Sequence, residues 1–484
     1  MKKLKIVHIA SEVAPFSKTG GLADVARSLP KALSRLGHEV RIITPLYGKV
    51  IDKKKYNLKK IFSEVEVFLN SKESVKVNYW QGYAMEGLPI YFIENTKYFS
   101  KHKDIYGSGR ENARFLIFNV ASLKLISLLK FEADIVHCHD WQTGLIPFYL
   151  KTDFRYSKTL KQAKTVYTIH NLIFQFGQNW WQVPAEKKDY GRKRLPHISD
   201  ENIEYINFAK RGILSADIIN TVSEQYRDEI MTKKFGQDLH RILKNRDQRL
   251  FGIINGIDYN TYNPDNDDKI FKNYNHTNLE LKSLNKEYLQ DQNNLPINAN
   301  IPVLCTTSRV TFQKGFDLIL KIIEPLLKLD IQIIIMGDGD KNYLKPLRKI
   351  ARHNPKKLVL MPFKQDKETL LYAGSDIFLL PSNHEPCGIN QLIAMRYGCI
   401  PVVREVGGLY DTVDNYSPAT KKGTGFTFTD NNPFMFFRAI VRALEAEKNK
   451  KAWHNLISRA MRRSNSWEIP AKKYVELYKK VLKS

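Results

Sequence analysis

Runs of β-branched and other apolar residues alternate along the chain with longer segments in which apolar residues recur at helical spacing. The first set comprises a predicted strand at residues 4–10, a helix at 22–36 and a strand at 40–44. This order predicts a βαβ unit, in which helices cover a parallel sheet. Further strands of the first half are predicted at 134–138, 165–169, 217–221 and 251–254, and helices at 111–130, 141–150, 203–214 and 224–233. Segment 65–92 alternates like an antiparallel insertion.

A second series of strands and helices begins near residue 301. It follows residues 259–300, whose Asn, Asp and Lys content predicts a polar interdomain segment. We therefore expect an α/β protein of two Rossmann-like, doubly wound domains, at 1–258 and 301–465, with a C-terminal helix in 466–484 that packs back toward the first. Ligands of such sheets bind beyond the carboxyl ends of the strands, so we expect the site in a cleft between the domains.

Composition and charge exclude several classes of protein. The 484 residues are 43 % apolar, which is enough for large cores and excludes a disordered chain. Lys+Arg 76 against Asp+Glu 50 gives a net charge of +26, but the lysines are dispersed, so we expect no specific nucleic-acid partner. No apolar run approaches the ~20 residues of a membrane span, and the cysteines lack metal or disulfide spacing. These features predict a cytoplasmic protein with no membrane span.

The segment after the first predicted strand contains Lys18, Gly20, Gly21 and Asp24 at a strand-to-helix turn. Backbone amides at a helix start attract anions, and glycine allows close approach of a phosphate or sugar. The spacing is neither that of a dinucleotide-binding GxGxxG motif nor that of a P-loop. By itself, this segment is better explained as an ordinary turn with a solvated lysine.

Two loops of the second half carry further candidate residues at strand ends. Arg309 and Lys314 follow the strand at 303–308, where two cations suit a diphosphate leaving group. Glu385 follows the strand at 377–380 and precedes the amides of residues 388–390. A carboxylate there suits sugar hydroxyls or a developing oxocarbenium ion. The alternatives are surface cations and a helix-capping carboxylate.

Seven segments together closely resemble the family of bacterial glycogen synthases and plant starch synthases. Their order and spacing match as well, and the resemblance extends from about residue 5 to the final helix. The segments are 17–25, 137–141, 168–172, 253–258, 308–315, 381–391 and 407–413. The resemblance implies a GT-B fold and a retaining glucosyltransferase for glycogen biosynthesis, which moves glucose from ADP-glucose to the non-reducing end of an α-1,4-glucan. It implies no metal or resident cofactor, and leaves the preferred base and the oligomeric state open.

The resemblance also assigns roles to individual residues. Lys18 with the Gly20 and Gly21 amides would lie beside the donor phosphates and the acceptor, and Arg309 with Lys314 would bind the diphosphate. Glu385 would hold the donor glucose, together with the amides of Gly388, Ile389 and Asn390. His139 would contact that glucose from the opposite domain, and closure of the domains would assemble these groups and exclude water.

Three assignments rest on position alone. Asn255 lies where the family has a polar donor-site residue, and Asp24 is expected to be structural or acceptor-side. Phe363 occupies the place of an aromatic that stacks on the base, although a core side chain is the alternative. Front-face attack, with the diphosphate deprotonating the incoming 4-hydroxyl, is the mechanism that the family implies.

The chain departs from the family pattern at several positions. Asn383 and His384 stand where Arg and an aromatic are common, and Glu111 with Asn112 where an acidic pair is common. The pair Trp180–Trp181 lies in an atypical stretch and is either a sugar-stacking platform or loop packing. Two other functions remain open: a GT-B transferase with another donor, and a non-catalytic glucan- or polyanion-binding protein of the same fold.

Overall fold

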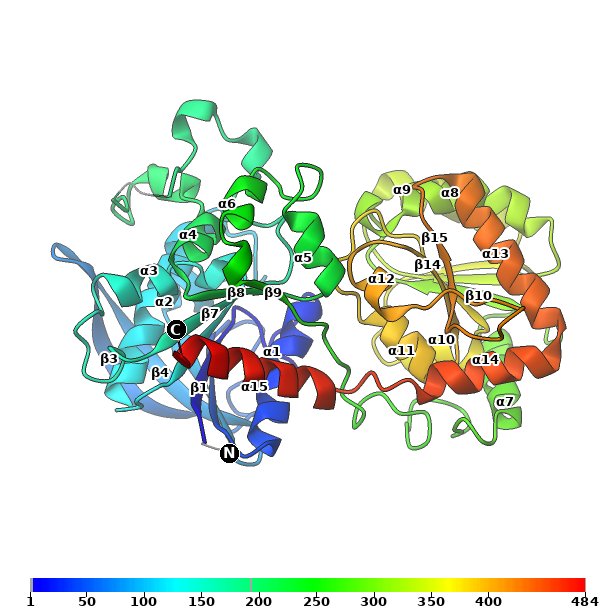
Figure 1. Cartoon of the computed structure of the whole chain (residues 1–484), viewed down its shortest axis with the longest axis horizontal. Coiled ribbons are helices and arrows are strands. Elements are labelled where there is room, and N and C mark those ends of the chain that lie inside the picture. Colours follow the sequence, from blue (N-terminus) through cyan, green and yellow to red (C-terminus); the bar gives the residue numbers. More distant parts are fainter. Residues whose placement is uncertain (1–2, 192–193, 484) are drawn as a thin grey trace. The chain divides into compact units, whose positions relative to one another are not determined.

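The chain folds into two compact units, each built around its own sheet (Figure 1). The computed structural model describes residues 3–191 and 194–483, so the predicted domain ends at 1 and 484 lie outside the described residues. The first unit comprises Met1–Asn255 with Trp467–Ser484, and the second comprises Gly256–Ser466. The chain therefore crosses between the units at two places, after Asn255 and after Ser466.

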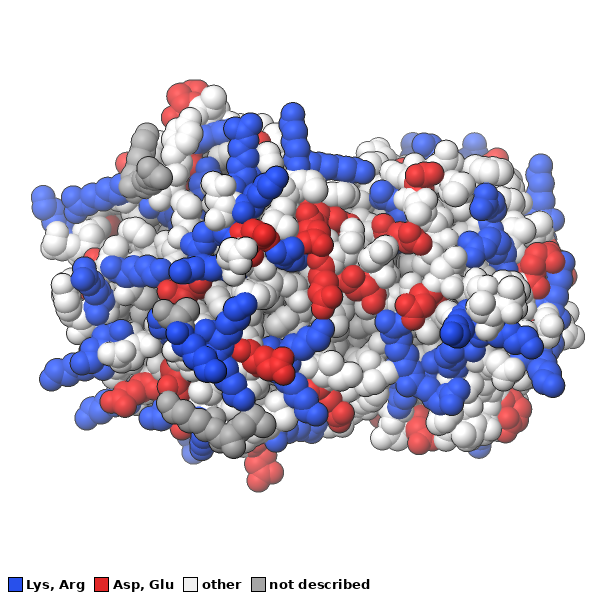
Figure 2. Space-filling model, in the orientation of Figure 1, with Lys and Arg blue, Asp and Glu red and all other residues white. Residues whose placement is uncertain are grey.

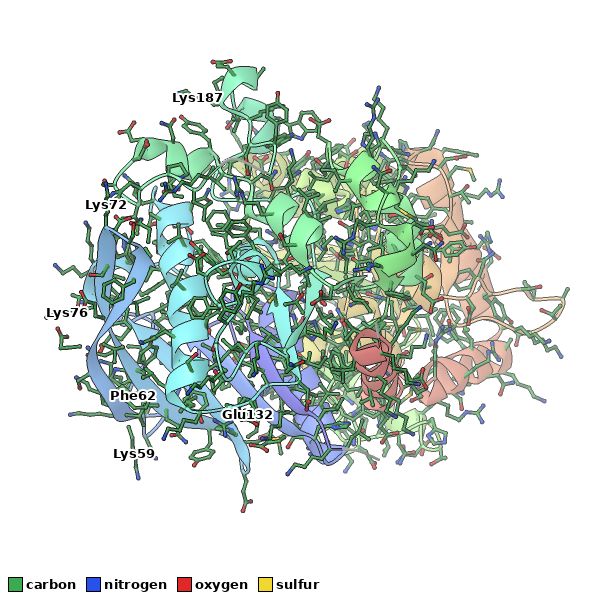
Figure 3. The ribbon with its side chains drawn as sticks, turned by 60° about the vertical axis from the view of Figure 1, so that its left-hand side comes forward. Lys59, Phe62, Lys72, Lys76, Glu132 and Lys187 are labelled. Atoms are coloured by element: carbon green, nitrogen blue, oxygen red, sulfur yellow. The ribbon has the colours of Figure 1, made fainter. Side chains whose placement is uncertain are left out.

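The sheet of the first unit has the strand order β3-β4-β5-β2-β1-β6-β7-β8-β9. Its strands are β1 Lys5–Ile9, β2 Glu39–Pro45, β3 Lys59–Asn70, β4 Glu73–Met85, β5 Leu88–Glu94, β6 Ile135–His139, β7 Lys164–Ile169, β8 Ile218–Thr221 and β9 Leu250–Gly252. All neighbours are parallel except β3–β4 and β4–β5, which confirms an antiparallel insertion. Lys59, Phe62, Lys72 and Lys76 lie on the β3–β4 hairpin at the sheet edge (Figure 3), where lysines discourage pairing with another chain.

The helices of the first unit follow the predicted pattern, except that two predicted helices begin as 3-10 turns, the one at 141–150 with η2 Trp141–Thr143. They are α1 Gly21–Arg35, α2 Glu111–Leu128, α3 Ile146–Lys151, α4 Phe208–Ser215, α5 Glu224–Ile230, α6 His240–Lys244 and α15 Glu468–Lys483. The helix predicted at 203–214 begins as a 3-10 turn, η5 Glu201–Tyr205, before α4. Helix α1 buries Leu22, Val25, Ala26, Leu29 and Leu33, which are spaced three or four residues apart as one helix face requires.

The second unit has a parallel sheet of order β12-β11-β10-β13-β14-β15. Its strands are β10 Val303–Thr307, β11 Gln332–Met336, β12 Leu358–Met361, β13 Ile377–Leu380, β14 Ile400–Arg404 and β15 Phe426–Phe428. Its helices are α7 Glu280–Gln292, α8 Phe316–Leu327, α9 Lys341–His353, α10 Glu368–Gly374, α11 Asn390–Arg396, α12 Gly407–Thr412, α13 Pro433–Lys448 and α14 Lys450–Arg462. The fold class predicted from the sequence is confirmed.

The polar segment 259–300 is not a separate linker, which corrects the prediction. It belongs to the second unit, where α7 packs against α10. The reason is that several polar side chains of α7 are buried as hydrogen-bond partners of backbone groups. The Lys282 ammonium donates to the carbonyls of Tyr372, Ala373 and Ser375 at 3.1, 2.6 and 2.9 Å, at the carboxyl end of α10.

Both sheets place loops at a topological switch point. In the first unit β1 pairs with β2 on one side and with β6 on the other, so the loops after β1 and β6 leave the same edge of the sheet side by side. In the second unit β10 pairs with β11 and with β13, and the loops after β10 and β13 are neighbours in the same way. These four loops carry most of the candidate residues.

Candidate functional site

The loops after β10 and β13 are joined by backbone and side-chain hydrogen bonds. The backbone N–H of Asn383 donates to the Gln313 carbonyl at 2.9 Å, and its side-chain amide donates to the Phe312 carbonyl at 2.7 Å. Gly315 has φ +76, and a Cβ there would lie 2.0 Å from the Pro381 carbonyl oxygen, so only glycine allows this approach. Asn383, a departure from the family pattern, therefore holds the two loops together.

This junction brings Lys314 and Glu385 into direct contact. The Lys314 ammonium donates to Glu385 Oε2 at 2.6 Å, and the Ser382 hydroxyl donates to the same oxygen at 2.9 Å. The two side chains are largely buried, 17 % and 6 % exposed. Charge-assisted bonds of this kind fix both side chains before a ligand arrives. The sequence had placed these residues on separate loops.

Arg309 lies on the same loop as Lys314 but takes no part in the ion pair with Glu385. The residue is exposed just after β10, and its guanidinium makes no hydrogen bond or ion pair with any residue in the described part of the chain. A guanidinium offers five donors in a planar fork that fits phosphate oxygens. The loop after β10 thus carries one cation without a partner among the described residues, Arg309, and one that is already held by an ion pair, Lys314.

The segment before α11 adds backbone groups near the end of β10. The Asn390 side-chain amide donates to the Thr307 carbonyl at 2.8 Å, which ties the start of α11 to the last residue of β10. Gly388 has φ +70, a conformation that favours glycine. In the described ranges the N–H groups of Gly388 and Ile389 donate to no protein acceptor, so they remain for a ligand.

Phe363 lies after β12 and is 46 % exposed, so it is not a core side chain. Its backbone N–H donates to Asp338 Oδ2 at 3.0 Å, which fixes the loop rather than the ring. Strand β11 separates β12 from β10 in the sheet. The ring therefore belongs to the same sheet edge as Arg309, and no direct contact joins them in the described residues.

In the first unit, Lys18 and Asp24 form an ion pair across the turn that starts α1. The Lys18 ammonium lies 2.8 Å from Asp24 Oδ2, and both side chains are partly exposed. Gly20 and Gly21 are exposed beside them, and a Cβ at Gly21 would meet nothing within 4 Å. Neither φ nor packing requires glycine here, so the fold itself does not explain why the turn lacks side chains.

Glu12 is a residue of this site that the sequence did not indicate. The carboxylate is buried, and its Oε2 accepts hydrogen bonds from the Thr19 N–H at 2.5 Å and the Thr19 hydroxyl at 2.9 Å. Burial raises the pKa of Glu12 to about 7. Glu12 thus fixes the turn that carries Lys18 and Gly20. Its position just beyond the first strand was the available signal.

Asp140 holds the corresponding loop after β6. It has φ +58, which is uncommon for a residue with a side chain, and such strain clusters at functional sites. Its Oδ1 accepts from the backbone N–H of His170 at 2.7 Å and of Asn171 at 3.3 Å. Burial raises the pKa of Asp140 to about 7, with a smaller contribution from the charge of Glu12. The carboxyl groups of Glu12 and Asp140 therefore lie at the same edge of the sheet, where each holds a loop in place.

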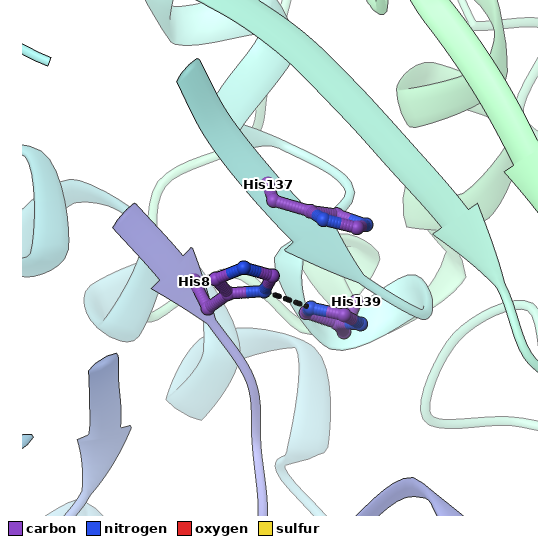
Figure 4. Close-up of side chains that lie close together, drawn as sticks. All are labelled: His8, His137 and His139. Carbon is purple, nitrogen blue, oxygen red and sulfur yellow. Dashed lines mark hydrogen bonds between the residues drawn. The ribbon is translucent and has the colours of Figure 1, made fainter. Parts of the chain in front are cut away.

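His139 is fully buried within a chain of hydrogen-bonded histidines. His8 Nδ1 and His139 Nε2 are 3.0 Å apart (Figure 4), and His139 Nδ1 and His170 Nε2 are also 3.0 Å apart. Burial lowers the pKa of His8 and of His170 to about 3, so both rings are neutral at pH 7. His170 is the partly exposed end of this row of hydrogen-bonded histidines, and sequence analysis did not single it out.

His8, His137 and His139 are close enough to be considered as metal ligands. One ring nitrogen from each lies within 4.8 Å of the others (Figure 4). Both nitrogens of His137 are already bonded, to the Tyr478 hydroxyl and the Thr168 hydroxyl at 2.7 Å each. Both nitrogens of His139 are bonded as well. Binding an ion would require exchanging these bonds, so the arrangement fits a neutral hydrogen-bonded network better than a metal centre.

Asn255 does not share a loop junction with the other candidate residues of the first unit. It is buried after β9, which β7 and β8 separate from β6. Its Oδ1 has no hydrogen-bond partner in the part of the chain that the structure describes. Two of the departures from the family pattern have structural roles: Glu111 pairs with Arg114 at 2.6 Å, and the Asn112 side chain donates to the Ile203 carbonyl at 2.8 Å.

On the face drawn in Figure 2, Lys and Arg side chains are spread over the surface with acidic side chains among them, and the described residues form no basic stripe on that face. None of the described helices is long and apolar enough to cross a membrane.

Comparison with known proteins gives consistent matches over the whole chain. A family model described as "Starch synthase catalytic domain" matches residues 5–245, and one described as "Glycosyl transferases group 1" matches residues 288–461. A curated glycogen synthase of Geotalea daltonii is 40 % identical over 489 residues, which cover 99 % of each chain. A glycogen synthase of Thermotoga maritima is 39 % identical, again with 99 % of each chain covered.

Solved structures agree with these relatives. The catalytic domain of Starch Synthase IV from Arabidopsis thaliana, bound to ADP and acarbose, superposes with a TM-score of 0.88 at 32 % identity, covering 100 % of both chains. Sucrose-phosphate synthase from Thermosynechococcus elongatus superposes with a TM-score of 0.64 at 15 % identity, which indicates the shared fold alone.

Proposed function

The chain belongs to the family of bacterial glycogen synthases and plant starch synthases, which are GT-B glycosyltransferases, and we propose that its donor is ADP-glucose and its acceptor an α-1,4-glucan. Glucose would be added at the non-reducing end with retention of configuration. The observation that carries the proposal is the contact between Lys314 and Glu385 beside the uncommitted Arg309. This arrangement offers a carboxylate for sugar hydroxyls and cations for a diphosphate within one loop junction.

The cations supply the main stabilisation of the transition state. As the bond between the anomeric carbon and the diphosphate oxygen breaks, negative charge accumulates on the leaving nucleoside diphosphate. Arg309 and Lys314 neutralise that charge, and positioned donors of this kind contribute roughly 3–4 kcal/mol each. The positive end of the site therefore replaces what a divalent ion does in other transferases, and the proposal includes no resident metal or organic cofactor.

The proton of the attacking hydroxyl goes to the departing diphosphate. This assignment is supported by the carboxylates of the candidate loops, which are already engaged by protein groups. Glu385 is bound by Lys314 and Ser382, Glu12 by Thr19, and Asp24 by Lys18. None is presented as an uncommitted nucleophile for a double displacement. In front-face attack the 4-hydroxyl oxygen bonds to the anomeric carbon on the side that the diphosphate leaves, and configuration is retained.

The first unit contributes a positive charge and open backbone at the turn of Gly20 and Gly21. A Cβ at Gly21 would meet no atom within 4 Å, and one at Gly20 only Glu12 Oε1 at 3.9 Å, so a phosphate or a sugar can approach the amides closely. Lys18 balances Asp24 in the unliganded protein and is able to exchange that partner for a phosphate oxygen. We extend the proposal to a reducing compartment, the cytoplasm, because the four cysteines are buried thiols rather than disulfides.

The test is release of nucleoside diphosphate from ADP-glucose and from UDP-glucose, each with and without glycogen. The proposal expects glycogen-dependent release that is faster from ADP-glucose. Faster release from UDP-glucose would replace the donor assignment. Release that does not depend on glycogen would replace the acceptor. Glycogen binding without release from either donor would favour a non-catalytic glucan-binding protein of this fold.

A further inference from the structure

An exposed tryptophan is held rigidly on the segment that connects β7 to α4. Trp181 is 62 % exposed, yet its indole Nε1 donates to Gln237 Oε1 at 3.2 Å and its backbone N–H donates to Asn179 Oδ1 at 3.1 Å. Exposed aromatic rings of this size cost free energy because they leave apolar surface in water. A ring that is both exposed and fixed is therefore suited to a ligand rather than to the core.

The neighbouring Trp180 anchors the same segment in the core. It is buried, and its Nε1 donates to Asp238 Oδ2 at 3.0 Å. The two acceptor residues, Gln237 and Asp238, have φ +48 and φ +66, which is uncommon for residues with side chains. This turn supplies one hydrogen-bond acceptor to each indole N–H. We call Trp180, Trp181, Lys188, Gln237 and Asp238 the tryptophan platform.

The charges around the platform are largely neutralised within the protein. The Lys188 ammonium lies 4.5 Å from the centre of the Trp180 ring and 3.7 Å from Asp238 Oδ2. Lys210, 5.0 Å from the same ring, donates to the Asp189 carbonyl at 2.7 Å. An anionic ligand would compete with these partners, whereas a neutral ligand with hydroxyl groups would not. The local electrostatics favour an uncharged polyhydroxylated ligand.

The platform lies on a part of the first unit that projects into solvent. Lys187, on the same segment, is at the upper edge of the molecule in Figure 3. Tyr190, 68 % exposed, lies 5.8 Å from the Lys210 ammonium and adds a second exposed ring to this surface. The platform is separate in sequence from the turn of Lys18 and from the loops of Arg309 and Glu385. It is used by none of the steps proposed above.

We propose that the tryptophan platform binds an α-1,4-glucan chain by stacking a glucose ring on Trp181. The carbon–hydrogen face of a sugar fits an aromatic face, and hydroxyl groups at its rim can exchange with water beside Gln237 and Lys188. This inference rests on the proposed function, because that function supplies the polymer. The platform holds a long acceptor at a second point, so it raises affinity for glycogen without acting on the transferred glucose.

The experiment compares Trp181→Ala with Tyr83→Ala, which removes a ring of nearly equal exposure, 61 %, from β4. Binding is measured by retardation in native gels that contain glycogen, and by gels that contain heparin. Activity is measured with glycogen and with maltotriose as acceptors. Trp181→Ala is expected to weaken glycogen binding about tenfold and to raise the KM for glycogen similarly, with kcat and the KM for maltotriose unchanged. Trp181→Phe, which keeps a stacking ring without the indole N–H, is expected to retain most of the binding.

Three outcomes would overturn the inference: unchanged glycogen retardation in Trp181→Ala, an equal loss in Tyr83→Ala, or a loss in heparin gels without one in glycogen gels. Loss of binding in Trp181→Phe equal to that in Trp181→Ala would also contradict stacking. Failure of the proposed function is distinguishable, since it would appear as absent donor turnover with maltotriose. Glycogen binding that depends on Trp181 would then still stand.

Discussion

Lys314 and Glu385 form the most constrained pair among the candidate residues, and removing one member exposes what the pair does. Lys314→Ala leaves the buried Glu385 carboxylate with the Ser382 hydroxyl alone, and removes a cation from the leaving diphosphate. We expect kcat/KM for the donor to fall about 10²–10³-fold. Steady-state rates of diphosphate release measure this, with the exposed Lys321→Ala on α8 as the control. Activity within about twofold of the parent would contradict the role of Lys314.

Substituting Gly21 tests whether the turn that begins α1 needs glycine for ligand binding or for folding. A methyl group at Gly21 meets no atom within 4 Å, so Gly21→Ala is expected to keep the thermal unfolding midpoint of the parent. The added group would stand where a phosphate or sugar approaches the amides, so we expect at least about a tenfold loss of kcat/KM. Gly315→Ala is the contrasting variant, because its Cβ collides with the Pro381 carbonyl and should destabilise the protein. Full activity in Gly21→Ala would show that nothing binds at this turn.

The buried carboxyl of Glu12 makes stability depend on pH. Its pKa is raised from 4.5 to about 7 by burial, so the folded state keeps the proton longer than the unfolded state does. The contribution to stability is fully present below about pH 4.5 and is lost as the pH rises through about 7. In the parent, the free energy of unfolding should fall by up to roughly 3 kcal/mol between these pH values because of Glu12, and in Glu12→Gln this fall should be absent.

Denaturant unfolding of the parent and of Glu12→Gln at several pH values between about 5 and 8 measures this difference. Exposed Glu132→Gln is the control, and should follow the parent. Asp140, whose pKa is also raised to about 7, leaves part of the dependence in place. Parallel curves for parent and Glu12→Gln would mean that Glu12 is ionised in the folded protein.

At the residue level, the sequence indicated the groups at strand ends but not those that hold them. Lys18, Arg309, Lys314 and Glu385 stand in loops whose position follows from strand order alone. Glu12, Asp140 and His170 act through burial and through bonds to residues far away in the chain, and neither is visible before the sheet is assembled. The contact of Lys314 with Glu385 was equally invisible, because it depends on Gly315 and Asn383.

At the level of elements, helix α15 is held in the first unit by two tyrosines one turn apart. The Tyr478 hydroxyl lies 2.7 Å from His137 Nδ1, and the Tyr474 hydroxyl accepts from the Asn220 side chain at 2.9 Å. Tyr478→Phe leaves a fully buried ring nitrogen of His137 without its partner. We expect a loss of about 1–3 kcal/mol, seen as a lower thermal unfolding midpoint. Tyr156→Phe, at an exposed position, is the control, and an equal effect of both would contradict this account.

The pattern of apolar residues predicted the strands and long helices well, because a buried face imposes its period on the sequence. The pattern of apolar residues did not predict helix α7. Its buried face contains Lys282, Asn285, Lys286 and Gln290 among few apolar residues. Lysine and amide side chains there satisfy backbone carbonyls and Asp376, with the Lys286 ammonium 2.7 Å from its Oδ2. A helix stabilised through buried polar bonds has the composition of a linker.

At the level of the whole molecule, the doubly wound architecture of both units and the family were predictable from motif order, and the comparisons confirm both. The return of the C-terminal helix to the first unit means that this unit is built from two separate pieces of chain, whereas the second unit is one continuous piece. The net charge of +26 is not gathered in one patch on the face drawn in Figure 2, where basic and acidic side chains are mixed.

The central claim is that glucose from ADP-glucose becomes the non-reducing end of an α-1,4-glucan. The most direct measurement is to incubate the protein with glycogen and ADP-glucose labelled in the glucose, and then to digest the washed polymer with β-amylase. The account predicts that the label enters the polymer and is released almost entirely as maltose, because β-amylase removes maltose units from non-reducing α-1,4 ends. Label that stays in the polymer after digestion, or that appears as free glucose without entering it, would contradict the account.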